Sequence, residues 1–293
     1  MPIERRVLLS LRPGERGRFQ EALLAAGLVD QLVAPLAADE PLHEIDLPSD
    51  DAIVALTSAM AANGLGRPVV RRYWRPTPKE LRCCELLSMF VWIHASGLPK
   101  PRREQRLDLG AACAECGAGL RPAGPARLRK REVPTRPPLG SVSGGVLLVH
   151  DELLAALEAE RISGLGFERA LDADGAPLPW HEARAAHTLA PMRVGTTGMF
   201  RGAIAGERPC GRCGRDGWFD DPAQPFTPSY GRDVLDGMPD AAETYELFGK
   251  GALREPLHAS DLARPRLIVR RRVYELFRRL KLRGARFSPV ALA

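Results

Sequence analysis

The sequence contains no apolar run of about 18 residues, the minimum length for a membrane-spanning helix. Its longest apolar run, LLSMFVWI at 86–93, is short enough to indicate a buried helix. The N-terminal segment also lacks the apolar core and the small-residue cleavage site of a signal peptide. We therefore expect a cytoplasmic protein that does not bind a membrane.

Catalytic motifs are missing as well. The sequence has no GxSxG elbow, no GxxxxGK[ST] loop and no GxGxxG after a strand pattern. HEARAAH at 181–187 is not HExxH, because its two histidines are six residues apart and would lie on different faces of a helix. Aromatic residues make up only 6%, so a stacking platform for single-stranded nucleic acid is not indicated. We expect a protein that is not an enzyme.

Lysine is scarce, so the net charge of +6 comes mostly from arginine. This surplus is small for 293 residues and is a weak indication of nucleic-acid binding. The densest positive charge flanks the apolar stripe of a predicted helix near the C-terminus. It has two interpretations: a solvated face whose stems cover the edge of the core, or a docking surface for an acidic protein or a phosphate backbone. The candidate partner-binding residues are Arg270, Arg271, Arg272, Arg278 and Arg279.

Strand and helix patterns alternate over the first hundred residues. The predicted strands are 5–11, 43–47 and 68–74, and the predicted helices are 12–33, 51–64 and 76–97. The last of these helices would contain Cys83 and Cys84, packed as small apolar residues. This alternation predicts a small α/β layer over residues 1–100. A polar, proline-bearing stretch near residue 100 marks the start of a second domain, 101–293.

Two segments of the second domain, 145–171 and 265–292, align without a gap when shifted by 120 positions. Leu147, Val149, Gly164 and Phe167 meet identical residues, and the apolar positions between them correspond. Both segments predict a strand, a short helix, a glycine at the helix stop and a second strand. We infer an internal duplication. The alternative is that two ordinary strand–helix–strand units align by chance.

The motif CxxCG occurs twice, at 113–117 and 210–214. Each copy places two sulfurs on one side of a tight turn, and the glycine permits the backbone twist that aims amide groups at the thiolates. A structural zinc ion takes four ligands, so two copies complete one closed site with no position for a substrate. The predicted Zn²⁺ ligands are Cys113, Cys116, Cys210 and Cys213, with Gly117 and Gly214 as turn glycines. The alternatives are a redox dithiol, two independent thiols, or a metal shared within a dimer.

The paired CxxCG elements and the closing segment LIV…RVYELFRRLKLRGARFSPV resemble the myxobacterial double-CXXCG motif family. The resemblance covers roughly residues 105–293 and includes the four cysteines and both glycines. It implies an immunity protein that neutralises a cognate toxin exchanged between neighbouring cells, and that catalyses no reaction itself.

The expected fold is α+β: an N-terminal α/β layer, then a duplicated strand–helix–strand domain clamped by a four-cysteine zinc site. The expected function is binding of a toxin protein. One alternative is a zinc-ribbon protein that binds nucleic acid through the C-terminal arginines. Another is an enzyme whose site does not show in a single sequence.

Overall fold

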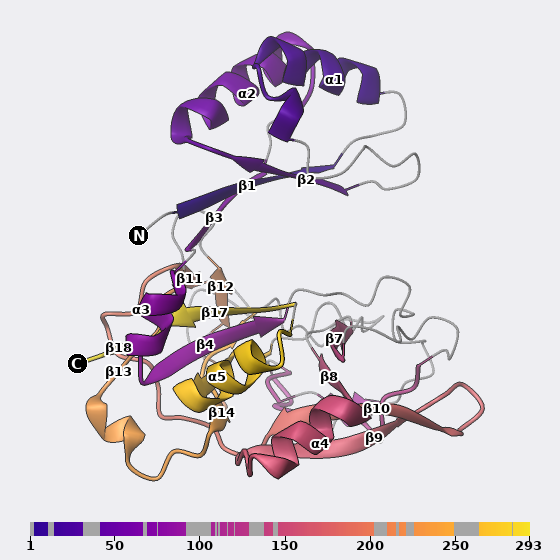
Figure 1. Ribbon diagram of the computed structural model, residues 1–293, viewed down its shortest axis with the longest axis vertical. Coiled ribbons are helices and arrows are strands. Elements are labelled where there is room, and N and C mark those ends of the chain that lie inside the picture. The colour runs from indigo at the N-terminus through magenta and orange to yellow at the C-terminus, as the bar shows by residue number, and fades with distance from the viewer. Residues whose placement is uncertain are drawn as a thin grey trace. The chain divides into compact units, whose positions relative to one another are not determined.

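The chain combines helices with antiparallel sheets in the computed structural model, so its class is α+β, as predicted (Figure 1). It divides into two compact units. Unit 1 comprises Met1–Thr77 and Asp221–Phe226, and unit 2 comprises Pro78–Asp220 and Thr227–Ala293. The predicted boundary near residue 100 thus lies inside unit 2. The structure describes residues 3–10, 15–31, 42–66, 69–74, 76–91, 107–108, 110, 112–115, 117–119, 121–128, 138–142, 146–201, 210–214, 217–220, 226–248, 264–282 and 284–293.

Unit 1 is a three-stranded antiparallel sheet with two helices on one face (Figure 1). Its elements are β1 (Ile3–Ser10), α1 (Arg16–Ala25), the 3₁₀ turn η1 (Val29–Gln31), β2 (Leu42–Leu47), α2 (Asp50–Ala62) and β3 (Val69–Trp74), in the sheet order β2-β1-β3. Ser49 caps α2 by accepting a hydrogen bond from the amide of Ala52 at 3.1 Å. Phe19 and Leu23 of α1 pack against Leu56 of α2 in the core of this unit.

The helix predicted over 76–97 is wrong. The chain forms a short helix, α3 (Pro78–Cys83), and then a strand, β4 (Leu86–Val91). This strand pairs on both edges, with β16 (Leu267–Arg270) and β17 (Ala285–Pro289). Its residues 86–89 are all buried, and a strand buried on both faces is continuously apolar. A short apolar run of this kind cannot be assigned to helix or strand by periodicity alone.

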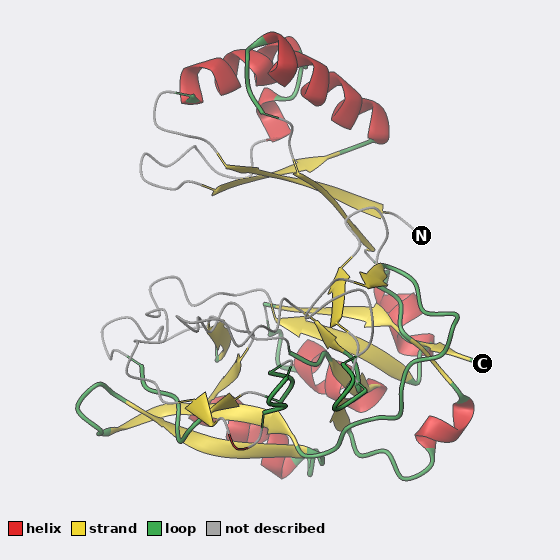
Figure 2. Ribbon diagram, turned by 180° about the vertical axis from the view of Figure 1, so that it is seen from behind, coloured by secondary structure: helices red, strands yellow, loops and turns green. Residues whose placement is uncertain are grey.

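Unit 2 contains two four-stranded sheets, each with one helix (Figure 2). The first has the order β7 (Leu139–Val142), β8 (Val146–His150), β10 (Pro177–Ala185), β9 (Leu165–Leu171), with helix α4 (Asp151–Ala159). The second has the order β14 (Ala241–Glu243), β16, β4, β17, with helix α5 (Arg271–Arg279). Neighbouring strands are antiparallel throughout both sheets. Apolar residues of both helices and both sheets form one hydrophobic cluster, so the sheets share a core.

The two predicted strand–helix–strand segments are present, and their helices lie 120 positions apart. Both helices end in the same hydrogen-bonded motif: Ile162 donates to the carbonyl of Leu157 at 2.9 Å, and Leu282 donates to the carbonyl of Phe277 at 3.0 Å. The left-handed residue after each helix is Arg161 or Lys281, each with φ of 53°, and not the predicted glycine. Gly164 and Gly284 have φ of 88° and 98° and form the turn into the next strand.

Shorter strands carry the cysteine motifs. Strands β5 (Leu107–Asp108) and β6 (Arg121–Pro122) pair around the first CxxCG, and β11 (Met199–Arg201) and β12 (Gly217–Asp220) pair around the second. The remaining elements are β13 (Ser229–Tyr230), the 3₁₀ turn η4 (Arg232–Leu235), β15 (Leu247–Phe248) and β18 (Ala291–Leu292). None of the helices in the described ranges is both long enough and apolar enough to cross a membrane.

Candidate metal centre

The two CxxCG motifs adopt the same turn. The amide of Gly117 donates to the carbonyl of Cys113 at 2.8 Å, and the amide of Gly214 donates to the carbonyl of Cys210 at 2.8 Å. The φ angles of the two glycines are 71° and 70°, a conformation that a residue without Cβ adopts at little cost. The glycines therefore close each turn through the carbonyl of the first cysteine.

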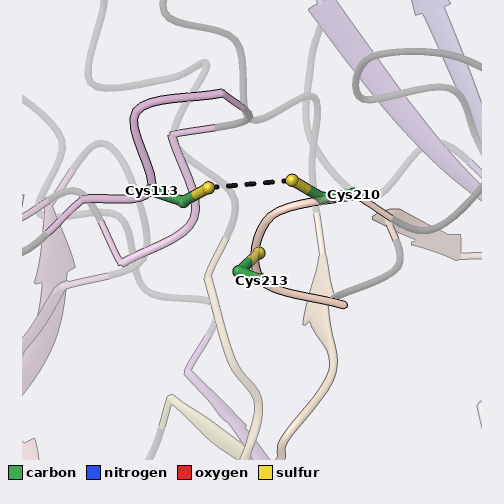
Figure 3. A group of neighbouring side chains, drawn as sticks. All are labelled: Cys113, Cys210 and Cys213. Atoms are coloured by element: carbon green, nitrogen blue, oxygen red, sulfur yellow. Dashed lines mark hydrogen bonds between the residues drawn. The ribbon is translucent and has the colours of Figure 1, made fainter.

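Three cysteine sulfurs come together in unit 2. The Sγ atoms of Cys113, Cys210 and Cys213 all lie within 4.8 Å of one another (Figure 3). The Sγ atoms of Cys113 and Cys210 are 3.7 Å apart, which is longer than a disulfide bond of about 2.05 Å. Two sulfurs at about 2.3 Å from one zinc ion, with a tetrahedral angle between them, are separated by about 3.8 Å. This spacing fits a tetrahedral thiolate site.

The surroundings of the cluster suit a structural metal. Cys210 is 8% exposed, and the cluster packs against Ala118 and Leu247. The three cysteines come from hairpins 97 positions apart in the chain, so an ion bound here would join distant segments. The predicted fourth ligand, Cys116, lies outside the described residues. Three close cysteines can thus bind a metal ion in this unit.

The geometry is unlike that of a redox dithiol. A thioredoxin-like CxxC opens a helix after a strand, whereas Cys210 and Cys213 lie in a turn between two strands. Of the adjacent cysteines outside the cluster, Cys84 packs as predicted, whereas the predicted packing of Cys83 is wrong. Cys83 is exposed at the end of α3, and Cys84 packs against the core and donates from Sγ to the carbonyl of Glu80 at 3.3 Å. Burial, followed by the charges of Cys83 and Glu80, raises the pKa of the Cys84 thiol.

Four of the five candidate partner-binding arginines have partners within the chain. Arg270 donates to the carbonyls of Leu235 and Met238, and Arg271 donates to the carbonyl of Arg82 at 2.9 Å. The side chain of Arg278 is exposed and makes no hydrogen bond or ion pair with any residue that the structure describes. These contacts favour the interpretation that most of the charge stabilises the fold.

The other two arginines connect the two sheets' helices. Arg272 lies 3.4 Å from the carboxylate of Asp240 and also donates to the carbonyl of Glu160, which follows α4. Arg279 pairs with the side chain of the same Glu160. The Asp240 carboxylate in turn accepts hydrogen bonds from the amide and the hydroxyl of Ser163, both at 2.9 Å. This polar network holds the end of α4 to the strand and helix of the second sheet.

A hollow of about 560 Å³ lies beside the second CxxCG motif, and Gly214 is part of its lining. Aromatic and thioether side chains contribute much of the remaining wall: Trp218, Tyr245, Met192 and Met199. Val194 lies at the hollow and is fully exposed to solvent. Sequence analysis did not single out these residues, because they come from three separate segments with no common motif.

Unit 2 also buries charge away from the cysteines. Glu182 is 2% exposed and accepts a hydrogen bond of 2.7 Å from Nε of Arg184, which raises the pKa of that guanidinium. Burial lowers the pKa of nearby Arg264. The neighbouring residue His181, part of HEARAAH, is buried on strand β10 with Nε2 2.8 Å from Asp151 Oδ1. Glu182 and His181 are thus buried groups with partners, whereas Nε and Nη2 of Arg264 have no hydrogen-bond partner among the described residues.

One buried hydroxyl has no partner. The hydroxyl of Tyr230 makes no hydrogen bond to any described residue, and its side chain is buried. Burial, and then the charge of Glu246, raises the pKa of Tyr230.

No protein-family model matches the chain, and no curated protein matches it.

Proposed function

We propose that the chain is a non-catalytic, zinc-stabilised binding protein, and that its partner is a toxin that it neutralises. The observation that carries the proposal is the convergence of Cys113, Cys210 and Cys213 at the spacing of a tetrahedral thiolate site. Cys116 is the fourth ligand in this proposal. A shell of four thiolates has no position left for water or substrate, so the ion acts on structure alone.

The proposal includes an internal duplication of unit 2. Both strand–helix–strand segments have nine-residue helices with the same ending, and both CxxCG turns have the same hydrogen bond. Each copy supplies two of the four ligands. The ion then holds the copies in one orientation, with a binding free energy on the order of 10 kcal/mol or more to offset the closure of a long loop.

The toxin as partner follows from the resemblance to the double-CXXCG family. The hollow beside Gly214 is the surface where we place the contact, because Trp, Tyr and Met are the residue types enriched in protein interfaces. Val194 offers an exposed apolar side chain at this surface. The nucleic-acid alternative has less support, since Arg270, Arg271 and Arg272 already bind carbonyl groups of the chain.

Metal analysis of the purified chain tests the first part. We expect one zinc ion per chain, and we expect Cys210→Ser or Cys213→Ser to lose it. Cys83→Ser is the matched control, because Cys83 lies outside the cluster and is exposed, and this variant should keep the ion. Full zinc content in both cluster variants would contradict the proposed site.

Growth assays test the second part. Each protein encoded beside this chain's gene is expressed alone and together with the chain. We expect one of them to arrest growth, and the chain to bind it and restore growth. Val194→Asp should weaken rescue and binding, whereas Val54→Asp, the same change at an exposed site of α2, should not. Equal rescue by the two variants would rule out the hollow. Binding to DNA that falls steeply with salt, with no toxin among the neighbours, would favour the alternative.

A further inference from the structure

The two four-stranded sheets of unit 2 have the same strand order and the same register. In each sheet, the strand in the third position pairs on one side with the strand before the helix and on the other side with the strand after it. The residues that meet across the three strands correspond one by one. They are Leu148, Glu182 and Glu168 in the first sheet, and Ile268, Ser88 and Ser288 in the second.

This register extends the repeat beyond the two strand–helix–strand segments. The shift is 120 positions for the outer two residues of each set, Leu148 to Ile268 and Glu168 to Ser288, but 94 positions for the central one, Ser88 to Glu182. Strand β4 is therefore the counterpart of the last part of β10, 180–185. The CxxCG hairpins correspond with a shift of 97, and the edge strands β7 and β14 with a shift of 102.

Residues 86–171 and 180–289 thus share one series of elements in the same order, to which the second segment adds β13, η4 and β15. Each begins with a strand, continues with a hairpin that carries CxxCG, and then forms an edge strand, a strand, a helix and a final strand. We call these segments half A (86–171) and half B (180–289). The gradual growth of the shift along the chain is what insertions into the loops of half B would produce.

The first strand of each half lies in the sheet of the other half. Strand β4 belongs to half A in sequence, but it is inserted between β16 and β17 of half B. Strand β10 belongs to half B, but it is inserted between β8 and β9 of half A. The contacts are reciprocal elsewhere too: β4 contacts β7, and its counterpart β10 contacts β14.

We propose that unit 2 is a covalently joined pseudo-dimer whose halves have exchanged their first strands, with the metal centre on the axis that relates them. A reciprocal exchange between two equivalent halves closes as a two-fold arrangement. A two-fold axis passes through the midpoint between equivalent atoms, and the sulfurs of the counterparts Cys113 and Cys210 are 3.7 Å apart. The axis therefore runs through the cysteine cluster. This inference rests on the duplication proposed above, and not on the identity of any partner.

The exchange gives the metal centre a specific role. Besides the shared core and the polar network around Asp240, the halves are connected by the inserted strands and by the cysteines. The inserted strands bury their side chains, including Leu87 of β4 and Trp180 of β10, and they do not depend on the ion. Loss of the metal should release the two CxxCG hairpins from each other while the halves stay associated. The metal centre is thus a local connection between the halves that depends on the ion, whereas the exchanged strands join the halves without it.

Cleavage of the chain between the two halves tests whether the exchanged strands keep the halves associated. A protease site is inserted in the full chain between Asp174 and Gly175, in the exposed turn that links β9 to β10. After cleavage, we expect the two fragments to elute together in size-exclusion chromatography, with or without a strong zinc chelator, and to separate only in denaturant. Separation of the fragments in native buffer, in either condition, would overturn the proposal.

Cross-linking of the cleaved chain distinguishes exchange from ordinary packing. If strands are exchanged, Ser88 neighbours Ser288 of half B; if they are not, Ser88 neighbours Glu168 of its own half. In a background with Cys83 and Cys84 changed to serine, oxidation of Ser88→Cys/Ser288→Cys should give a disulfide between positions 88 and 288. Mass spectrometry of the non-reduced digest identifies it, because Cys113 and Cys210 are close enough to join the fragments on a gel by themselves. Ser88→Cys/Glu168→Cys is the matched control and should give no disulfide between positions 88 and 168. A disulfide in the control pair would refute the exchange even if zinc binding and toxin binding were both established.

Discussion

Replacing Gly164 with alanine probes the contact between the two halves of unit 2. Gly164 has φ of 88°, and a Cβ atom added there would lie 2.1 Å from the carbonyl oxygen of Ala241 and 2.8 Å from side-chain carbons of Pro239. Gly175 is a matched control. Its φ is 92°, and an added Cβ would meet nothing within 4 Å. Both alanine variants carry the same backbone strain, so their difference isolates the contact.

The expected magnitudes follow from these distances. A left-handed alanine costs about 1–2 kcal/mol at either site. At Gly164, the overlap with backbone adds about 1–3 kcal/mol of overpacking, and it displaces the hydrogen bond of 3.1 Å from Ala241 to the carbonyl of Ser163, worth about 1 kcal/mol. We therefore expect Gly164→Ala to lower the free energy of unfolding by at least about 2 kcal/mol more than Gly175→Ala.

Urea denaturation followed by tryptophan fluorescence measures this difference, because Trp180 is buried in the first sheet. The matching separation of melting temperatures is at least about 4 °C for a unit of this size. Equal destabilisation by the two variants would show that residues 163–164 and 239–241 are not in contact. The hydrogen bonds between Ser163 and Asp240 in the polar network would then lose their basis.

Three further substitutions test individual side chains. Tyr230→Phe should raise the free energy of unfolding by up to about 1 kcal/mol, because it removes a buried hydroxyl without a partner. Burial raises the pKa of Tyr230, so the wild type should lose stability above about pH 10, where the tyrosine of the unfolded chain ionises first. Urea titrations over this pH range should show a smaller loss for the variant. Iodoacetamide should alkylate Cys83 faster than Cys84 at pH 8.5, because burial raises the pKa of Cys84. Mass spectrometry of variants in which one of the two cysteines is serine measures both rates. Faster labelling of Cys84 would contradict its packing. Arg184→Leu should cost about 3 kcal/mol in denaturation because it leaves the carboxylate of Glu182 buried without its 2.7 Å donor, and the double variant with Glu182→Leu should recover part of that loss.

Local features of unit 2 could be predicted from the sequence with good accuracy. The strand–helix–strand segments at 145–171 and 265–292 form as expected, since the apolar periodicity of a helix depends on neighbours within a few residues. The residue at each helix stop was predicted wrongly, because Arg161 and Lys281 take the left-handed conformation expected of glycine. The CxxCG turns also form, because a glycine in the left-handed region decides their shape locally. The meeting of Cys113 with Cys210 was expected only because a zinc ion needs more ligands than one motif supplies.

Contacts between distant parts of the sequence decided the strand at 86–91 and the partners of the arginines of α5. The run at 86–91 is compatible with a helix or a buried strand, and it became β4 because half B has room for a strand between β16 and β17. The arginines of α5 bind carbonyls at Arg82 and Glu160, more than a hundred positions away, so no local pattern could reveal their partners.

The sequence by itself determined the two strand–helix–strand segments and the two CxxCG turns, because each is encoded within a few residues by backbone preference and apolar spacing. Only the tertiary structure decided which sheet each first strand joins. Strand pairing can satisfy the same backbone hydrogen bonds with either equivalent sheet, so the choice depends on how loops and neighbouring halves fit together in space.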